Sequence, residues 1–550
     1  MFKNHPKGLI VAFFTNMGER FGFYTMMAIL VLFLQAKYGL SEEKAGDIYS
    51  WFYFGIYALA LVGGLIADFT KNYKGVIFVG IIVMLLGYVV IATPGMSLTI
   101  TVIGLFTIAL GNGLFKGNLQ ALVGQLYDNE QYGKLRDSAF MLFYMGINIG
   151  AFFAPNAATA MRNWFLRTNG FQHDANLPAL CHQFRDGALQ NVAQFQTLAN
   201  NASLTGPVTD LQKFATDYLD VFARGYNYAF GIAAVAMIIS LISYVLFHKL
   251  LPNKRAIEKT KPASEKIQMS SSEEWQRVFA LLLVFVVVIF FWMSFHQNGL
   301  TLTFFARDYT VKQVGPITNI YFDLKALLSV IAAIIGLVFL FNKKNKLNLR
   351  LIGGLMTLVG AVLAYWFYSS YQPLNDIQPE TFQQFNPLFI VFLTPVFIAF
   401  FAMLNKRGKE PSTPKKIGIG MIIAAIGFLV ILVGSIGLPS PASLKGTISP
   451  ERASAYWLIT NYLILTVAEL FLSPMGLSFV SKVAPPRLQG LMQGGWLAAT
   501  ATGNKLLFVG SYFWSRLELW QLWAIFMICC LLSAAFIFSI MKWLEKATKS

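Results

Sequence analysis

Two charged residues, Glu19 and Arg20, stand inside the first long apolar segment of the chain, from about residue 9 to residue 34. A charge at the centre of a membrane costs several kcal/mol unless it is paired or faces water. Neighbouring side chains on a helix point about 100° apart, so these two need not pair, and we expect at least one to face a polar cavity. The alternative is a structural ion pair that holds two helices together. The chemistry favoured here is the binding of a charged solute.

A lysine, Lys116, interrupts the fourth apolar segment in the run Gly111-Asn-Gly-Leu-Phe-Lys116-Gly-Asn118. It lies too far from either end of the segment for its ammonium group to reach the membrane surface comfortably. We therefore expect a carboxylate partner for Lys116. That partner is either Glu19, in a structural pair, or the carboxylate of a cargo that alternates with Glu19.

Two more polar residues, Asn148 and Glu469, lie at comparable depth in later segments. Asn148 offers a donor and an acceptor, and glycines on either side of it thin the helix; helix packing is the alternative reading. The alternative for Glu469 is a salt bridge to Lys505 in the next segment. Two buried cations in the first half of the chain and one buried acid in the second suit a zwitterion that lies between them.

The composition excludes a soluble protein. Of 550 residues, 56% are hydrophobic, and the mean hydropathy is +0.57, which is typical of a polytopic membrane protein. We expect no cleavable signal, because no small-residue cleavage site follows the first segment. Most of the 43 Lys and Arg residues fall in loops on one side, so the net charge of +17 indicates orientation and not nucleic-acid binding. The three cysteines provide no disulfide framework.

The apolar segments define the predicted organisation. Six occur before a charged linker at 249–274 and eight after it. We predict an all-α membrane protein with 14 transmembrane helices and both termini in the cytoplasm. The predicted divisions are an N-terminal six-helix bundle (1–160 and 225–248), an extracytoplasmic loop (161–224), the linker, and a C-terminal bundle (275–550) with an extra hairpin at about 318–369. The hairpin is placed there because those two segments contain the fewest polar features.

Several ordered motifs resemble known families. Gly64-Leu-Ile-Ala-Asp68, followed by Lys71 and Lys74, resembles a loop of the major facilitator superfamily. The runs Glu19-Arg-Phe-x-Phe-Tyr24, Gly111-x-Gly-x-Phe-Lys116, Phe143-Tyr-x-x-Ile-Asn148-x-Gly150, Asn386-Pro387, Glu469-Leu-Phe-Leu-Ser473-Pro474, Gly495-Trp496 and Gly503-Asn504-Lys505 together resemble the proton-dependent oligopeptide transporter family. The likeness extends over nearly the whole core and omits 161–224 and the extra hairpin.

This resemblance implies a major facilitator fold of two six-helix bundles plus two extra helices. It also implies proton-coupled import of di- and tripeptides across the inner membrane by alternating access, without a cofactor and without enzymatic activity. The partners implied are peptides, protons and membrane lipids, with no nucleic acid, and the protein is expected to be a monomer. The alternatives are a peptide-binding sensor that does not transport, or a transporter of another zwitterion or of an anion such as nitrate. A buried acid such as Glu469 argues against the anion.

The resemblance also assigns roles to individual residues. The peptide carboxylate would be held by two cations, its amino group by an acid and two amides, and its side chain by aromatic residues. The implied substrate-binding residues are Arg20, Tyr24, Tyr57, Lys116, Asn148, Asn386, Glu469 and Trp496. Plain packing is the alternative for Tyr57 and Trp496.

The chain departs from the family at three places. Where the family usually has the first acidic residue of span one, this chain has Asn16. An amide does not take a proton at physiological pH. Where relatives have an acidic residue in span seven, this chain has His296. A histidine can titrate near neutrality or remain neutral and hydrogen-bonded. The candidates for proton coupling are therefore Glu19, His296 and Glu469. Finally, the hairpin follows span seven, whereas bacterial relatives usually insert theirs between spans six and seven.

Overall fold

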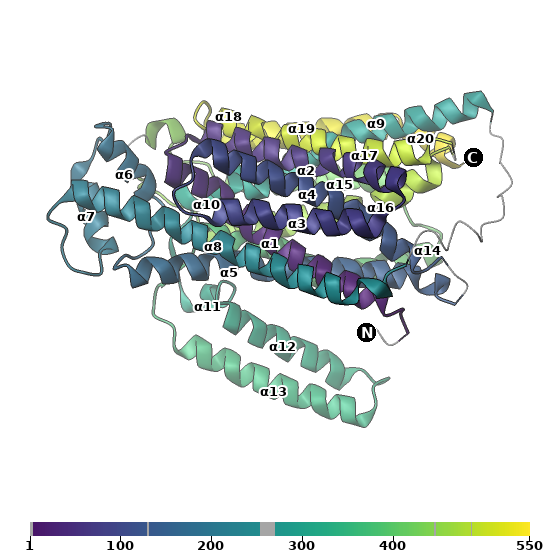
Figure 1. The fold of residues 1–550 in the computed structure, drawn as a ribbon, viewed down its shortest axis with the longest axis horizontal. Helices are drawn as coiled ribbons and strands as arrows, with labels where there is room; N and C mark the ends of the chain where they lie inside the picture. Colours follow the sequence, from purple (N-terminus) through teal and green to yellow (C-terminus); the bar gives the residue numbers. More distant parts are fainter. Residues whose placement is uncertain (1–3, 129–130, 253–269, 445–446, 486, 550) are drawn as a thin grey trace.

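The structure is a computed structural model that describes residues 4–128, 131–252, 270–444, 447–485 and 487–549. Most of the predicted linker lies outside the described residues. The described chain is almost entirely helical, with one short ribbon made by β1 (Gln313–Val314) and β2 (Asn375–Asp376), which pair antiparallel. Figure 1 shows long helices running roughly side by side. The predicted all-α class is confirmed.

The helices before residue 253 form what we call the first half. They are α1 (Gly8–Tyr38), α2 (Glu42–Thr70), α3 (Tyr73–Ala92), α4 (Leu98–Gln125), η1 (Gly133–Leu135), α5 (Arg136–Thr168), α6 (Leu177–Arg185), α7 (Val192–Ala202), α8 (Leu211–Phe247) and η2 (His248–Leu250). Local sequence sets several ends. The side chains of Ser41, Asn72 and Ser97 accept hydrogen bonds from the first turns of α2, α3 and α4. Gly39, with a φ of 63°, ends α1 in a left-handed conformation that glycine adopts at little cost.

The helices after residue 269 form the second half. They are α9 (Ser271–Phe295), η4 (His296–Gly299), α10 (Thr301–Asp308), α11 (Pro316–Asn319), α12 (Leu324–Phe341), α13 (Leu347–Ser369), η5 (Pro379–Gln384), α14 (Phe385–Lys406), α15 (Thr413–Val433), η6 (Pro441–Leu444), α16 (Ala455–Val483), α17 (Gln489–Lys505), α18 (Phe508–Trp514), α19 (Leu519–Ser539) and α20 (Met541–Lys549). The seventh predicted span is broken at η4, where His296 lies.

Thirteen helices in the described part of the chain are long and apolar enough to cross a membrane. The remaining one of the 14 predicted spans corresponds to α17 and α18. Its sequence contains Gly490, Gly494 and Gly495 beside glutamines, so it is less apolar than the others. It packs against α2 and α9, and neighbouring helices therefore cover much of its surface.

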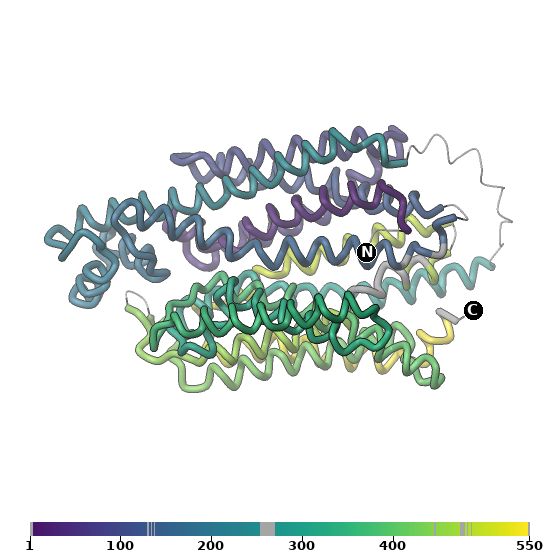
Figure 2. Tube along the Cα trace, turned by 90° about the horizontal axis from the view of Figure 1, so that it is seen from below, coloured from purple at the N-terminus to yellow at the C-terminus, as the bar shows by residue number. Residues whose placement is uncertain are grey.

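The two halves lie next to each other. Figure 2 shows the purple and blue helices of the first half in one layer and the green helices of the second half in another. Within the first half α1 packs on α5 and α8, and α3 packs on α4; within the second, α15 packs on α16 and α19. The halves meet where α2 contacts α17 and where α5 contacts α14.

The bundle has two distinguishable ends. Helices α6 and α7 lie beyond the bundle at one end, on the left of Figure 1, which we call the cap end. Both chain termini lie toward the opposite end, which we call the linker end. Helix α5 extends to Thr168 and α8 begins at Leu211, so the predicted loop boundaries at 161 and 224 fall inside helices.

The extra hairpin is made by α12 and α13 and lies beside the bundle in Figure 1. Its two helices pack on each other through glycines: a Cβ on Gly336 would lie 2.6 Å from the carbonyl oxygen of Gly353. At the start of α12, Asp323 accepts hydrogen bonds from the backbone of Lys325 and from the Tyr371 hydroxyl at 2.8 Å. Most other side chains of α13 are exposed and apolar, as expected for a helix surrounded by lipid.

Candidate functional site

Glu19 and Arg20 pair with each other on α1. Nε and Nη2 of Arg20 donate to the two carboxylate oxygens at 2.5 and 2.7 Å, and Asn112 of α4 donates to Glu19 at 2.6 Å. Both side chains are buried, with 0% and 4% exposure. Their place on neighbouring helix positions left this pair open, and the structure forms it within α1. Both side chains are long enough to bend toward each other, and burial makes two separated charges more costly than one pair.

Lys116 of α4 does not have the expected carboxylate partner among the residues that the structure describes. Its ammonium nitrogen lies 4.2 Å from the centre of the Tyr57 ring, a cation–π arrangement. Glu19, the alternative partner, is occupied by Arg20 and Asn112. The Lys116 side chain is partly exposed in the middle of the bundle. It therefore has a charge that a ligand carboxylate can approach.

Glu469 of α16 faces this region from the second half. Asn386 donates to Glu469 at 2.9 Å and to Thr466 at 3.0 Å, which fixes the amide between them. The alternative partner, Lys505, instead pairs with Asp47 of α2 at 2.6 Å. Within the described residues, the partly exposed Glu469 has no cation beside it.

The two tyrosines connect the charges of the two halves. Tyr24 and Tyr57 are partly exposed and close enough to both Arg20 and Glu469 for their charges to interact. We call Arg20, Tyr24, Tyr57, Lys116 and Glu469 the central cluster. It places two cations on the first half opposite one acid on the second. Sequence reasoning did not assign Asn112, which donates to Glu19, or Thr466, which accepts from Asn386. Only their polarity inside apolar segments could have indicated them.

Asn148 and Trp496 lie in different surroundings. The side-chain amide of Asn148 donates to the carbonyl of Tyr144 on its own helix at 3.0 Å, and it remains partly exposed. Tyr144 itself is 45% exposed although it lies within a span. Trp496 is only 5% exposed and packs edge-to-face on Phe285, with ring centres 6.2 Å apart. Its contacts in this conformation are those of a packed side chain.

His296 is enclosed by aromatic rings at the break between α9 and α10. Its Nδ1 lies 2.5 Å from the side-chain oxygen of Asn504, and its ring stacks on Trp292 with centres 4.7 Å apart. Tyr53 of the first half approaches the same ring at 4.5 Å. The charge of Lys116 is close enough to act on the ring. His296 is therefore hydrogen-bonded and only 6% exposed.

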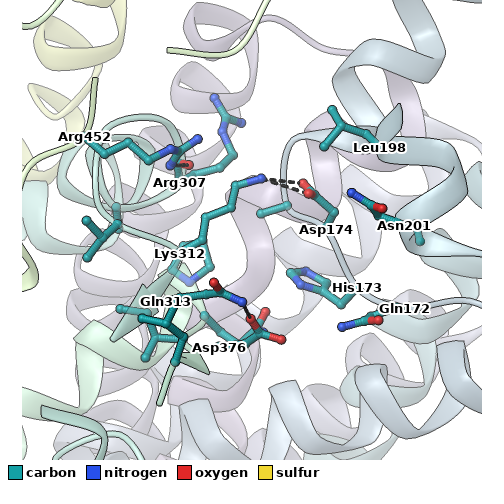
Figure 3. A pocket seen from close by; sticks show the side chains of 18 of the residues that line it. Gln172, His173, Asp174, Leu198, Asn201, Arg307, Lys312, Gln313, Asp376 and Arg452 are labelled. Carbon is teal, nitrogen blue, oxygen red and sulfur yellow. Dashed lines mark hydrogen bonds and ion pairs between the residues drawn. The ribbon is translucent and has the colours of Figure 1, made fainter. Parts of the chain in front are cut away.

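The described ion pairs that join the two halves lie at the cap end. They are Arg162–Glu380, Arg307–Glu42, Lys312–Asp174, Lys505–Asp47 and Arg516–Glu43. Figure 3 shows Lys312 reaching Asp174 at this end. Gln384 also bonds Asn156 across the halves at 2.5 Å. These contacts therefore hold the two halves together at the cap end. The sequence did not indicate these pairs, because their members lie far apart in the chain, as in Arg516 and Glu43.

A cavity of about 550 Å³ lies at the same end. It is bordered by the segment after α5, by the segment after α10 and by the segment before η5. Its polar lining includes Gln172, His173, Asp174, Arg307, Lys312 and Arg452 (Figure 3).

Comparisons with known proteins agree with this arrangement. A family model described as the POT family matches residues 74–269 and 372–515, and the unmatched segment between them contains the extra hairpin. Dipeptide and tripeptide permease A of Erwinia pyrifoliae is 26% identical over 90% of this chain and 83% of its own length. A peptide transporter of Yersinia enterocolitica is 28% identical over 92% and 87%.

Solved structures share the fold. A peptide transporter POT in complex with sulfate superposes with a TM-score of 0.67, at 22% identity, over 100% of this chain and 97% of its own. A POT family transporter in complex with 5-aminolevulinic acid gives 0.66 at 20% identity, over 100% and 98%. The family match spans more than half of the chain. The chain therefore belongs to the POT family, whose members are transporters and not enzymes.

Proposed function

We propose that the protein is a proton-coupled symporter that imports di- and tripeptides across the cell inner membrane. The observation that favours this most is the central cluster, in which the cations Arg20 and Lys116 on the first half lie opposite Glu469 on the second. A peptide with free termini has one charge of each sign, so it can satisfy both sides at once. Relatives named as dipeptide and tripeptide permeases support the same class of cargo.

The proposed binding mode follows from which groups are free. Lys116 lies over the face of Tyr57 and has no ion-pair partner among the described residues, so we assign it to the peptide carboxylate. Glu469 takes the peptide ammonium group, with Asn386 holding one of its oxygens. Tyr24 and Tyr57 line the space between these charges. We assign Asn148 to the peptide backbone and Trp496 to one wall of a side-chain pocket.

Alternating access assigns a direction to the two ends. The six predicted N-terminal spans and the C-terminal spans act as two bundles, joined by the predicted linker. We assign the cap end to the extracytoplasmic side and the linker end, with both termini, to the cytoplasm. Among the described residues, five ion pairs hold the halves together at the cap end, and we therefore assign this conformation as closed to the outside.

Proton coupling is assigned to groups that change the availability of a cation. Arg20 is held by both oxygens of Glu19, so it cannot bind a carboxylate fully while Glu19 is ionised. A proton on Glu19 releases Arg20 toward the peptide, and by linkage a bound peptide then favours that proton. His296 and Glu469 are the other candidates.

Uptake by the purified protein in proteoliposomes tests this proposal. A labelled dipeptide should accumulate when the outside is more acidic than the inside, and a second dipeptide should compete. Binding without uptake would indicate a sensor. Competition by nitrate, with none by dipeptides, would indicate an anion transporter.

A further inference from the structure

The cavity of about 550 Å³ at the cap end, which we call the cap-end cavity, has walls from both halves of the molecule. Its volume lies within the range of about 300–1,000 Å³ that is usual for small-molecule sites. One wall is made by the segment after α5 and by α7, and the other by the segments around β1, β2 and η5. The cavity therefore has this shape only while the two halves lie together.

The cap-end cavity is open to the solution on one side. Asn201 of α7 is exposed and Leu374 is 60% exposed, and both line the cavity. Ile377 and Phe382, which also line it, are only 7% and 2% exposed. A small solute can therefore enter past an exposed rim and contact a buried apolar floor.

Two cations of the lining already have acidic partners. Lys312 donates to both carboxylate oxygens of Asp174 at 2.9 Å (Figure 3). Arg307 pairs with Asp308 at 2.7 Å. These two cations are therefore largely neutralised by groups of the protein.

The third cation of the lining, Arg452, is held by neutral oxygens. Its Nη1 donates to the backbone carbonyls of Arg307 and Thr310, at 3.3 and 2.7 Å. Its Nη2 lies 3.5 Å from the side-chain oxygen of Asn176, which is a weak contact. No carboxylate lies within ion-pair distance of Arg452 in the part of the chain that the structure describes. Its charge is therefore available to a carboxylate in the cavity.

One acid of the lining, Asp376, has the opposite need. It is exposed at the rim, and it accepts a hydrogen bond from the side-chain amide of Gln313 at 2.8 Å across the β1–β2 ribbon (Figure 3). No cation of the described residues lies within ion-pair distance of it. Asp376 can therefore accept from an ammonium group in the cavity.

His173 supplies a second acceptor, from the first half. Burial and the charges of Arg162 and Lys312 hold the pKa of His173 well below its ordinary range, so the ring is neutral. The ring is hydrogen-bonded to Gln378, whose side-chain oxygen also accepts from Arg162 at 3.1 Å, so the ring is the donor in that bond. The other nitrogen of a neutral ring is an acceptor. That nitrogen, Nε2, is buried without a partner.

These groups suit a ligand that has one carboxylate and one ammonium group. The carboxylate meets Arg452, and the ammonium group meets Asp376 or Nε2 of His173; all three line the cap-end cavity (Figure 3). A dianion would instead meet the carboxylates of Asp174 and Asp376. Arg452 belongs to the second half and His173 to the first, so a ligand bonded to both connects the halves.

Resting on the peptide transport proposed above, we propose that the cap-end cavity is a second binding site for short peptides with free termini. It is separate from the central cluster and faces the external solution. A ligand that fits only one conformation increases the population of that conformation. A peptide in the cap-end cavity therefore stabilises the closed cap end, and a high external peptide concentration slows the opening that uptake requires.

The test measures occupancy of the cap-end cavity by protection of a thiol. Asn201→Cys places the thiol at the rim of the cavity, and Thr197→Cys places one on an exposed part of α7 outside it. The background lacks the native Cys181, Cys529 and Cys530. Maleimide labelling rates are measured on the purified protein in nanodiscs with increasing dialanine. At ten times the dissociation constant, Asn201→Cys should be labelled about tenfold more slowly and Thr197→Cys at an unchanged rate.

Variants decide whether the named charges bind the ligand. Arg452→Gln removes the cation and should weaken protection by dialanine about fivefold or more. Asp376→Asn removes an exposed acid, so it serves if the arginine variant does not fold, and it should also weaken protection. Arg185→Gln removes an exposed arginine of α6 that does not line the cavity and should behave as the parent. Parental protection in a folded Arg452→Gln or Asp376→Asn protein would overturn the proposal.

The ligand itself is varied in the same assay. N-acetyl-dialanine has no ammonium group and dialanine amide has no carboxylate, so each should protect Asn201→Cys about fivefold more weakly than dialanine. Equal protection by all three ligands would contradict recognition of the two termini.

Removing the central cluster separates this proposal from the proposed function. In Lys116→Ala/Glu469→Gln, dialanine should still protect Asn201→Cys, because the cap-end cavity is unchanged. Loss of protection there would mean that dialanine acts from the central cluster, and it would overturn the second site. If the parent takes up no dipeptide, the proposed transport is wrong, and protection still reports binding in the cavity. If it does, its uptake rate should fall at high external dialanine, and Arg452→Gln should abolish that fall.

Discussion

The substitution Glu469→Gln tests the proposed recognition of the peptide amino group with the least change in shape. Asn386 donates to one carboxylate oxygen of Glu469 at 2.9 Å. The other oxygen has no hydrogen-bond partner within the described part of the chain, and it is the one that a ligand ammonium group would meet. In the glutamine variant the amide oxygen satisfies Asn386, so the amide NH₂ faces the ligand. A donor then meets a donor, and a charge-assisted bond is lost.

The magnitude follows from the kind of bond that is removed. A hydrogen bond to a charged group contributes about 1.5–3 kcal/mol, against about 0.5–1.5 kcal/mol for a neutral one. The difference of about 1–2 kcal/mol corresponds to binding about 5–30-fold weaker. An N-acetylated dipeptide has no ammonium group, so its affinity should fall by less than about threefold.

Competition against a labelled dipeptide measures both affinities on the purified variant. Thr466→Val is a matched control, because it removes a neighbour of Asn386 and leaves the charge in place. It should affect both ligands equally. If Glu469→Gln weakens the free and the acetylated dipeptide by the same factor, Glu469 does not bind the amino group.

Three further substitutions examine the rest of the site. Lys116→Ala should abolish driven uptake and weaken dipeptide binding at least tenfold, whereas Lys325→Ala at the hairpin should leave both unchanged; parental affinity in a folded Lys116→Ala protein would remove Lys116 from the site. His296→Gln keeps a hydrogen-bonding side chain and removes titration, so counterflow exchange of peptide should persist while accumulation driven by a proton gradient is lost; full accumulation would leave Glu19 as the coupling group. Asn112→Leu withdraws a buried donor from Glu19 and should destabilise the folded protein by about 1–3 kcal/mol in thermal unfolding, and a stability equal to that of the parent would show that the Arg20 contact alone satisfies this carboxylate.

The helical class and the positions of the spans could be predicted from the sequence, because a segment that crosses a membrane must be long and apolar. Apolar length alone located the spans. The predicted span that contains α17 is the one without a helix long and apolar enough to cross a membrane by itself, and α17 packs against α2 and α9. Caps such as Ser41 and Ser97 also have a local signature in the sequence.

Pairing between charges was not predictable in the same way. The helix period places Glu19 and Arg20 on different faces, yet the flexible side chains bring their charged groups to 2.5 Å. The alternative reading of Glu469 paired it with Lys505 in the next span, whereas Lys505 pairs with Asp47 of α2. Arg162 and Glu380 each lie near the end of a span, where charged residues are ordinary, so nothing in their local sequence distinguished them. Spacing predicts which faces residues occupy, but long side chains and distant helices decide the partners.

The ribbon of β1 and β2 has a consequence for how the extra hairpin entered such a fold. Gln313 pairs with Asp376 and Val314 with Asn375, so the chain leaves for α12 and returns from α13 at almost the same point. An excursion that crosses the membrane an even number of times leaves every later helix in its original orientation. Because α12 and α13 bury glycines against each other, they can also insert into the lipid as one preassembled unit. Parity and a closed attachment point together permit gain, loss or relocation of such a hairpin during evolution without rebuilding the transporter that follows it.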